Sequence, residues 1–174
     1  MSIRRLFTVN TICFIAACLF LAGCSTYQFV TPTANWQTLV GQLLYSSPKR
    51  TIIGETVVTR MGDDQFQLDF MTGPGLSILK LRKDGARGRA EAAFARVSWQ
   101  GNADHPPRPL KSWLALHQIF TAIAALHGSP THAELHSEKP GFWTATAQLV
   151  DGKPVEVKIE FPASKERFFF HFGR

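Results

Sequence analysis

Residues 76–99, LSILKLRKDGARGRAEAAFARVSW, contain two strand-like runs on either side of a short turn. The turn is Asp84-Gly85, a dipeptide typical of two-residue β-hairpin loops because both residues tolerate a positive φ. A loop of these two residues places Lys83 opposite Ala86 and predicts an antiparallel pair of strands. Similar turns recur along the chain, so this hairpin indicates how the rest of the sheet is built.

Five other segments carry strand signals. Strict alternation of apolar and polar residues in 66–70 and 155–161 predicts two strands that each bury one face. Residues 51–60 are rich in Ile, Val and Thr, and the runs 142–149 and 165–172 are rich in aromatic residues. Short turns join most of these segments, so we expect about seven strands in an antiparallel meander.

Two helices are expected beside this sheet. Residues 110–126 have many Ala and Leu and no internal Gly or Pro, which favours a long helix. A second helix is predicted after Pro32, because apolar residues recur there at helical spacing. These residues are Trp36, Leu39, Val40, Leu43 and Leu44. The predicted fold class is therefore α+β, with a strongly curved sheet (an open barrel or cup), an N-terminal helix, and the long helix packed on the inner face.

The first 24 residues have the parts of an export signal. Arg4 and Arg5 precede an apolar run that starts at Leu6 and ends in Leu21-Ala22-Gly23-Cys24. These four residues resemble the lipobox of bacterial lipoproteins, in which the peptide before the Cys is removed and the thiol is acylated. The resemblance implies that Cys24 becomes a lipidated N-terminus. An ordinary signal peptide or an uncleaved anchor is the alternative.

This interpretation divides the chain into a signal peptide (1–23), a tether (24–33) and a single lipoprotein domain (34–174). Ser25 follows the acylated Cys in the pattern that resembles outer-membrane sorting. We therefore expect a protein anchored by lipid to the periplasmic face of the outer membrane. After residue 23 there is no apolar run of 18 or more residues, so we expect no transmembrane span in the rest of the chain.

Composition excludes several classes of function. The chain has three Cys, two in the signal and one at the lipidation site, so the mature domain would hold no disulfide, Cys nucleophile or thiolate metal site. Loss of Arg4 and Arg5 lowers the net charge from +6 to +4, which suits anionic lipid and is too small to indicate nucleic acid. Phosphate-loop, dinucleotide and Gly-x-Ser-x-Gly motifs are missing from the sequence, so we expect no cofactor and no enzyme activity.

The predicted hairpin has a basic face near its tip. Its register places Arg82 opposite Arg87 and Lys80 opposite Arg89, and all four side chains point to one side. Like charges placed opposite each other destabilise a strand pair. This face should therefore be solvated, which deters aggregation at a sheet edge, or contact anionic lipid headgroups.

Histidines supply the only metal candidate. His127, His132 and His136 lie close together in the sequence, with Glu134 and Glu138 nearby. Imidazoles bind zinc or copper, yet the spacing fits no standard pattern, so a solvated loop is the preferred interpretation and no metal is expected. A further histidine, His117, should lie at the border of the long helix's apolar face with a backbone partner.

The layout of the chain resembles one known group. A lipobox, an N-terminal helix, an antiparallel meander and a helix before the last strands are similar to the LolA/LolB group of lipoprotein carriers. The segment 73–82, GPGLSILKLR, also resembles part of small proteobacterial lipoproteins. The carrier resemblance implies an unclosed barrel capped by helices, and its exposed apolar loop would correspond to Gly73–Leu76.

Two functions follow as expectations. The abundance of Phe and Trp, 14 and 4 residues, fits either a filled core or an apolar cavity. The first expectation is an outer-membrane lipoprotein that binds an apolar or acyl ligand in a cup between sheet and helix, in lipoprotein or lipid handling. The alternative is a non-enzymatic structural or assembly lipoprotein that binds an envelope protein.

Overall fold

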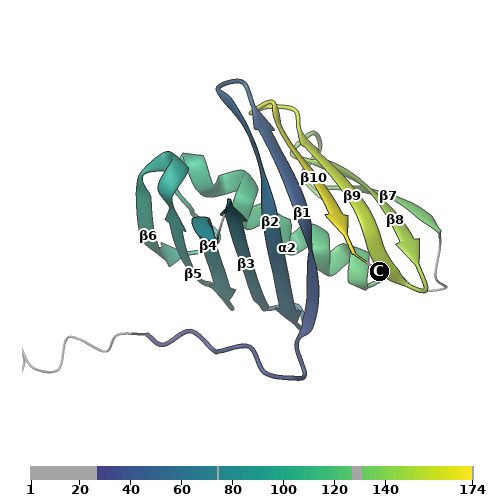
Figure 1. The fold of residues 1–174 in the computed structure, drawn as a ribbon, viewed down its shortest axis with the longest axis horizontal. Coiled ribbons are helices and arrows are strands. Elements are labelled where there is room, and N and C mark those ends of the chain that lie inside the picture. The colour runs from purple at the N-terminus through teal and green to yellow at the C-terminus, as the bar shows by residue number, and fades with distance from the viewer. Residues whose placement is uncertain (1–26, 74, 127–130, 174) are drawn as a thin grey trace, which may run out of the picture.

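The computed structural model describes residues 27–73, 75–126 and 131–173, which form a single curved antiparallel sheet with an α-helix across one face (Figure 1). The strands are β1 (Gln37–Ser47), β2 (Arg50–Met61), β3 (Gln65–Thr72), β4 (Leu76–Asp84), β5 (Arg87–Ala92), β6 (Val97–Asn102), β7 (His132–His136), β8 (Thr144–Val150), β9 (Lys153–Phe161) and β10 (Glu166–Phe172). The helix is α2 (Lys111–Ala124), and two short 3₁₀ turns are η1 (Ala93–Ala95) and η2 (Arg108–Leu110).

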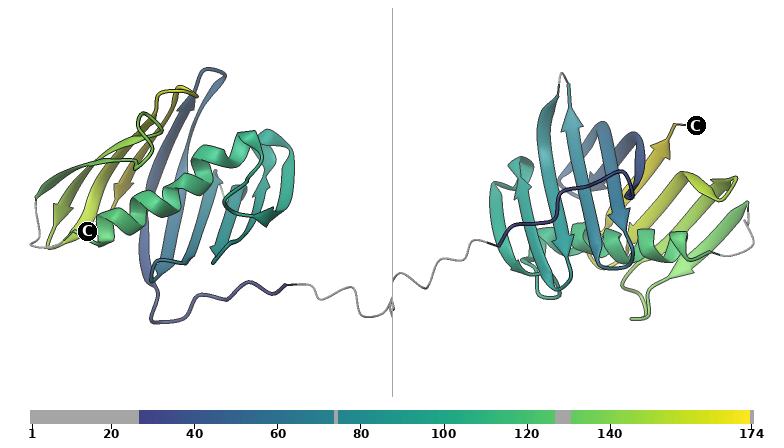
Figure 2. Two further views of the ribbon diagram at one scale, coloured as in Figure 1. Left: turned by 180° about the vertical axis from the view of Figure 1, so that it is seen from behind. Right: turned by 90° about the horizontal axis from the view of Figure 1, so that it is seen from below.

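The strand order is β6-β5-β4-β3-β2-β1-β10-β9-β8-β7. Every neighbouring pair is antiparallel, and β1 joins the two halves of the sheet because it pairs with both β2 and β10. The outer strands of the described sheet, β6 and β7, do not pair with each other, so the sheet is open. In the chain, α2 connects these two outer strands, and it crosses the concave face between them (Figure 2).

The core lies between the concave face and α2. Phe66, Leu68 and Phe70 of β3 are at most 1% exposed, as strict alternation predicts. From α2, five large side chains on one face are at most 4% exposed: Trp113, Leu116, Ile119, Phe120 and Ile123. The long helix and its packing on the inner face are therefore confirmed.

An aromatic cluster fills the space beneath the first half of α2. Trp113 lies at its centre, and its ring centroid is 4.7 to 6.0 Å from those of Tyr45, Phe70, Phe94 and Phe168. These four rings come from β1, β3, η1 and β10, so the cluster ties distant parts of the sheet to one helix. This part of the predicted cup is a packed core.

Two glycines let the central strands approach closely. A Cβ atom at Gly41 in β1 would lie 2.1 Å from the carbonyl oxygen of His171, and one at Gly54 in β2 would lie 2.0 Å from that of Met71. A side chain at either position would overlap the neighbouring backbone. Glycine inside a strand marks such a close approach or a sharp bend, which here lies where the sheet curves around α2.

The predicted N-terminal helix is wrong, because residues 37–47 form β1. Leu43 and Tyr45 are buried on the concave face, whereas Val40 on the other face is 61% exposed. The buried positions therefore follow the period of two of a strand. The apolar residues that helical spacing assigned to one face of a helix lie on the two opposite faces of this strand.

The predicted number of strands is too low, because ten are present in the described residues. The single strand expected over 86–99 is two strands, β5 and β6, separated by η1 and by Arg96 with φ of 51°. The solvated loop expected around His132 and His136 contains β7. By contrast, one of the recurring turns expected from the sequence, the Asp-Gly pair at 151–152, is confirmed, and both of its residues have positive φ, as a type I′ turn requires.

Candidate functional site

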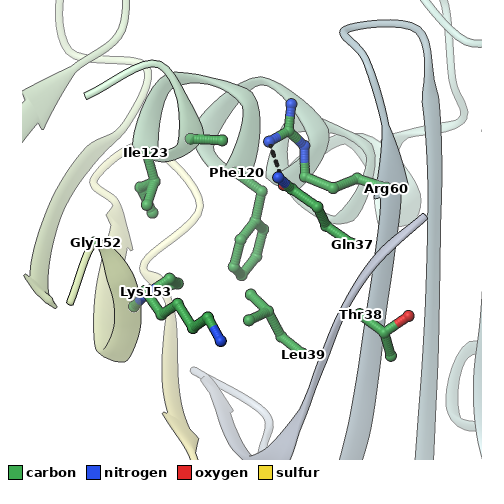
Figure 3. A pocket seen from close by; sticks show the side chains of 10 residues that line it. Gln37, Thr38, Leu39, Arg60, Phe120, Ile123, Gly152 and Lys153 are labelled. Atoms are coloured by element: carbon green, nitrogen blue, oxygen red, sulfur yellow. Dashed lines mark hydrogen bonds between the residues drawn. The ribbon is translucent and has the colours of Figure 1, made fainter. Parts of the chain in front are cut away.

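A groove of about 330 Å³ opens at one end of the space between sheet and helix. Its walls come from the start of β1, the end of β2, the last turns of α2 and the β8–β9 turn. The lining residues are Gln37, Thr38, Leu39, Arg60, Phe120, Ile123, Ala124, Gly152, Lys153 and Pro154. Figure 3 shows Phe120 and Ile123 projecting from α2 between Lys153 on one side and Arg60 on the other.

The groove combines an apolar floor with cations at its rim. Leu39, Phe120 and Ile123 provide the floor, and Arg60 and Lys153 provide the charges. Its volume is at the low end of the range of about 300–1,000 Å³ found for ligand sites. The arrangement suits the end of an acyl chain or one short chain, with an acidic group near the two cations.

Arg60 is the most unusual of these residues. Its side chain is only 12% exposed, and its nearest carboxylate, Asp63 at 3.8 Å, is 83% exposed. Its Nη1 donates to Oε1 of Gln37 at 3.0 Å and its Nη2 donates to the carbonyl of Gly62 at 2.9 Å. The buried Nε has no hydrogen-bond partner among the described residues. A mostly buried cation without a buried counterion favours a carboxylate or phosphate ligand.

Arg60 is not among the site residues predicted from the sequence. It lies near the end of β2, a strand in which Thr56 and Val58 are buried, and it is in phase with them at a spacing of two. An arginine at an inward position of a strand is the signal that could have identified it.

The basic hairpin face is present, but its predicted register is wrong. The two-residue loop is Gly85-Ala86, so Asp84 lies opposite Arg87, Arg82 opposite Arg89, and Lys80 opposite Glu91. Asp84 is held as the last strand residue because its carboxylate accepts hydrogen bonds from Tyr27 and Gln65.

This register changes the charge of the hairpin face. Lys80, Arg82, Arg87 and Arg89 still share one face, but Asp84 and Glu91 lie among them. Nη2 of Arg89 is 2.7 Å from Oε1 of Glu91. A single like-charged cross-strand pair therefore remains on this face, Arg82 with Arg89, and the face is less basic than the predicted register implied.

The candidate metal ligands are not brought together in the described residues. His132 and His136 are exposed at opposite ends of β7, which separates them by about 13 Å along the strand. His127 lies outside the described residues, as does Cys24. Within the described part of the chain, no three His, Cys, Asp or Glu side chains are placed to share a metal ion.

His117 lies at the border of the helix's buried face, as predicted. It is half-buried, and its Nε2 contacts the carbonyl oxygen of Asp63 in the β2–β3 turn. Burial lowers the pKa of His117 below its ordinary value of 6.5, and the nearby Lys83 lowers it further. The neutral ring with Nε2 protonated can donate to this carbonyl, so His117 connects α2 to the sheet.

A buried network also holds the start of α2. Glu166 of β10 accepts hydrogen bonds from the Tyr45 hydroxyl at 2.7 Å and the Ser112 hydroxyl at 2.6 Å. Burial and the contact with Glu166 raise the pKa of Tyr45 well above its ordinary value. The three residues join β1, α2 and β10. Neither Tyr45 nor Ser112 lines the groove, so we assign the network a structural role.

The described helix is too short to cross a membrane. Comparison with protein-family models and with curated proteins finds no match to this sequence. Among solved structures, one similar chain is a LolA superfamily protein from Nitrosomonas europaea, which is 8% identical. The alignment covers 83% of this chain and 87% of that one, with a TM-score of 0.47. At this identity and TM-score, inferences about function rest on the geometry of the chain itself.

Proposed function

We propose that this chain is an outer-membrane lipoprotein, anchored through acylated Cys24, that binds an acyl ligand in the groove between sheet and helix. The observation that carries the proposal is the pairing of an apolar floor with Arg60, a mostly buried cation that lacks a buried counterion. An acyl chain would cover Leu39, Phe120 and Ile123, and an acidic group on the ligand would accept hydrogen bonds from Arg60. Lipid or lipoprotein handling is the cellular role that follows.

The groove can be tested by filling it. Ala124 and Ala125 are both exposed residues at the end of α2, but only Ala124 lines the groove. Ala124→Trp should abolish binding of a fluorescent fatty acid to the purified protein, because the indole occupies the space of the chain, whereas Ala125→Trp should bind like the parent. Equal binding by both variants, or no binding by the parent chain at micromolar concentrations, would contradict the proposal.

A second candidate is a structural lipoprotein that binds an envelope protein through its convex face. Ile53 lies opposite Leu44, and Leu44 lies opposite Phe169, so three apolar side chains form a row across β2, β1 and β10. Ile53 is 61% exposed. Exposed apolar rows of this kind often contact a partner.

A matched pair of variants tests this second candidate. Ile53→Lys places a charge within the apolar row, and Thr51→Lys places one on the same face nearer the start of β2. Ile53→Lys should prevent cross-linking of the protein to an envelope partner in detergent extracts, and Thr51→Lys should preserve it. Identical cross-linking by both variants would count against this function.

A further inference from the structure

Residues 27–36, which we call the strap, precede β1 and lie along one edge of the sheet (Figure 1). By this edge we mean the side at which strands end in turns, not an outer strand. Residues 27–33 of the strap belong to the predicted tether (24–33). The described part of it instead packs against the folded domain. Trp36 at its end is 8% exposed, and Phe29 and Val30 lie close to Phe66 and to the last residues of β4.

Tyr27 holds the far end of the strap against the β4–β5 turn. Its hydroxyl donates to Oδ2 of Asp84 at 2.6 Å, and this bond raises the pKa of Tyr27. The guanidinium carbon of Arg87 is 4.2 Å from the centre of the Tyr27 ring, and Phe29 packs edge-on against that ring with centroids 5.1 Å apart. Three contacts of different kinds therefore converge on one side chain.

The strap and the groove mouth share the same edge of the sheet. Because all neighbouring strands are antiparallel, the start of β1 lies at the same edge as the β2–β3, β4–β5 and β8–β9 turns. The groove is lined by the start of β1, the end of β2 and the β8–β9 turn, so it opens there. The β1–β2 and β9–β10 turns lie at the opposite edge.

The strap leaves little chain between Tyr27 and the proposed anchor. Cys24 precedes Tyr27 by three residues, which span at most about 11 Å when fully extended. Acyl chains on Cys24 would lie in the bilayer, so Tyr27, which contacts the β4–β5 turn, would lie within that distance of the anchor. The neighbouring turns at this edge carry acidic residues, Asp63, Asp64 and Asp151, which anionic lipid would repel. The short link to the anchor, rather than the charge of this edge, therefore determines which edge faces the lipid.

We propose that the docked strap fixes the orientation of the domain on the bilayer, with the edge that carries the β4–β5 turn and the groove mouth facing the lipid headgroups. This inference rests on the proposed lipidation of Cys24. A ligand could then pass from the bilayer into the groove without crossing water. Arg82 and Arg87, beside the strap, would contact lipid phosphates.

A matched pair of single-cysteine variants tests the orientation. Ala86 in the β4–β5 turn and Ala163 in the β9–β10 turn are both exposed alanines. They lie at opposite edges of the sheet, which the length of β9 separates by about 30 Å. Full-length Ala86→Cys and Ala163→Cys are processed as lipoproteins, labelled with an environment-sensitive fluorophore, and reconstituted into vesicles. The vesicles contain phosphatidylethanolamine, phosphatidylglycerol and a lipid with a spin-labelled headgroup.

The expected result is strong quenching of the probe at position 86 and little quenching at position 163. Tyr27→Ala should remove this difference, because the strap no longer holds the turn near the anchor. Equal quenching of the two probes in acylated protein, or a difference that survives Tyr27→Ala, would overturn the inference. Mass spectrometry of the same samples separates the two proposals, since a chain without acyl groups on Cys24 contradicts the anchor itself.

Discussion

Arg60 carries the chemical selectivity of the groove at the scale of a single residue. A hydrogen bond between a charged donor and a ligand carboxylate contributes about 1.5–3 kcal/mol. Arg60→Met should therefore weaken fatty-acid binding about tenfold or more and leave binding of the matching fatty alcohol largely unchanged. Fluorescence titration with both ligands checks this expectation. Arg167→Met, at an arginine that is 71% exposed and far from the groove, is the control.

Comparing the binding of the two ligands also distinguishes two roles for Arg60: binding the ligand's acidic group, or supporting the groove wall. If Arg60→Met weakens binding of the acid and the alcohol equally, the guanidinium supports the groove wall and does not read the headgroup. If Arg167→Met has the same effect as Arg60→Met, the change reflects the net charge of the protein. Either outcome would contradict the role proposed for Arg60.

His117 should make the stability of the domain depend on pH. Its pKa is lowered by burial, so the unfolded chain binds its proton more readily than the folded chain does. The stabilising contribution is complete above pH 6.5 and is lost as pH falls from 6.5 to the lowered pKa of the folded state. Urea unfolding at pH 7.5 and pH 5.5 should show a smaller loss for His117→Gln, which stays neutral, than for the parent. An equal loss in both proteins would contradict this assignment.

At this scale the sequence predicted less of the site than of the fold. The apolar floor could be predicted, because Phe120 and Ile123 lie on the buried face of an evident helix. Arg60 was missed although its inward position in β2 was a signal for it, because an arginine near the end of a strand usually faces solvent. Its burial also depends on α2, which follows about 50 residues later. The acidic neighbours that reduce the charge of the hairpin face depend on a register that Tyr27 helps to fix.

At the scale of elements, strands with strict alternation were predicted correctly and ambiguous ones were not. Apolar and polar residues alternate over 66–70 in β3 and over 155–161 in β9, and both strands are confirmed. β1 contains apolar residues on both faces, because Val40 and Leu44 lie on the convex face while Leu43 and Tyr45 enter the core. Apolar residues on both faces hide the period of two, so periodicity alone favoured a helix.

The glycines of β1 and β2 lead to a prediction about the curvature of the sheet. Gly41→Ala and Gly54→Ala should each lower the free energy of unfolding by about 1–3 kcal/mol, because the new Cβ overlaps a neighbouring carbonyl and the strands must separate. Thermal unfolding followed by circular dichroism measures the effect. Gly173→Ala is the control, since a Cβ there meets open space, and an equally small effect at all three positions would show that the close approach is not required.

At the scale of the whole molecule, the antiparallel meander and the helix across its concave face followed from sequence. Tight turns such as Asp151-Gly152 predict which strands are neighbours, and the large face of 110–126 predicts burial against the sheet. The pairing of β1 with β10 could not be predicted, because it joins residues more than 120 positions apart and no turn connects them. This pairing makes one sheet of the two halves.

The central position of β1 predicts how stability is distributed over the molecule. β1 and β10 are bonded on both sides, whereas β6 and β7 are edge strands among the described residues and pair on one side only. Amide hydrogen exchange should therefore be slowest in β1, β2, β3 and β10, whose opening requires unfolding of the domain, and fastest in the two edge strands. Slow exchange in β7 comparable to that in β1 would show that another surface covers this edge. Exchange measured by mass spectrometry in free protein and again in vesicles distinguishes the two cases, since β7 should gain protection in vesicles only if the bilayer covers it.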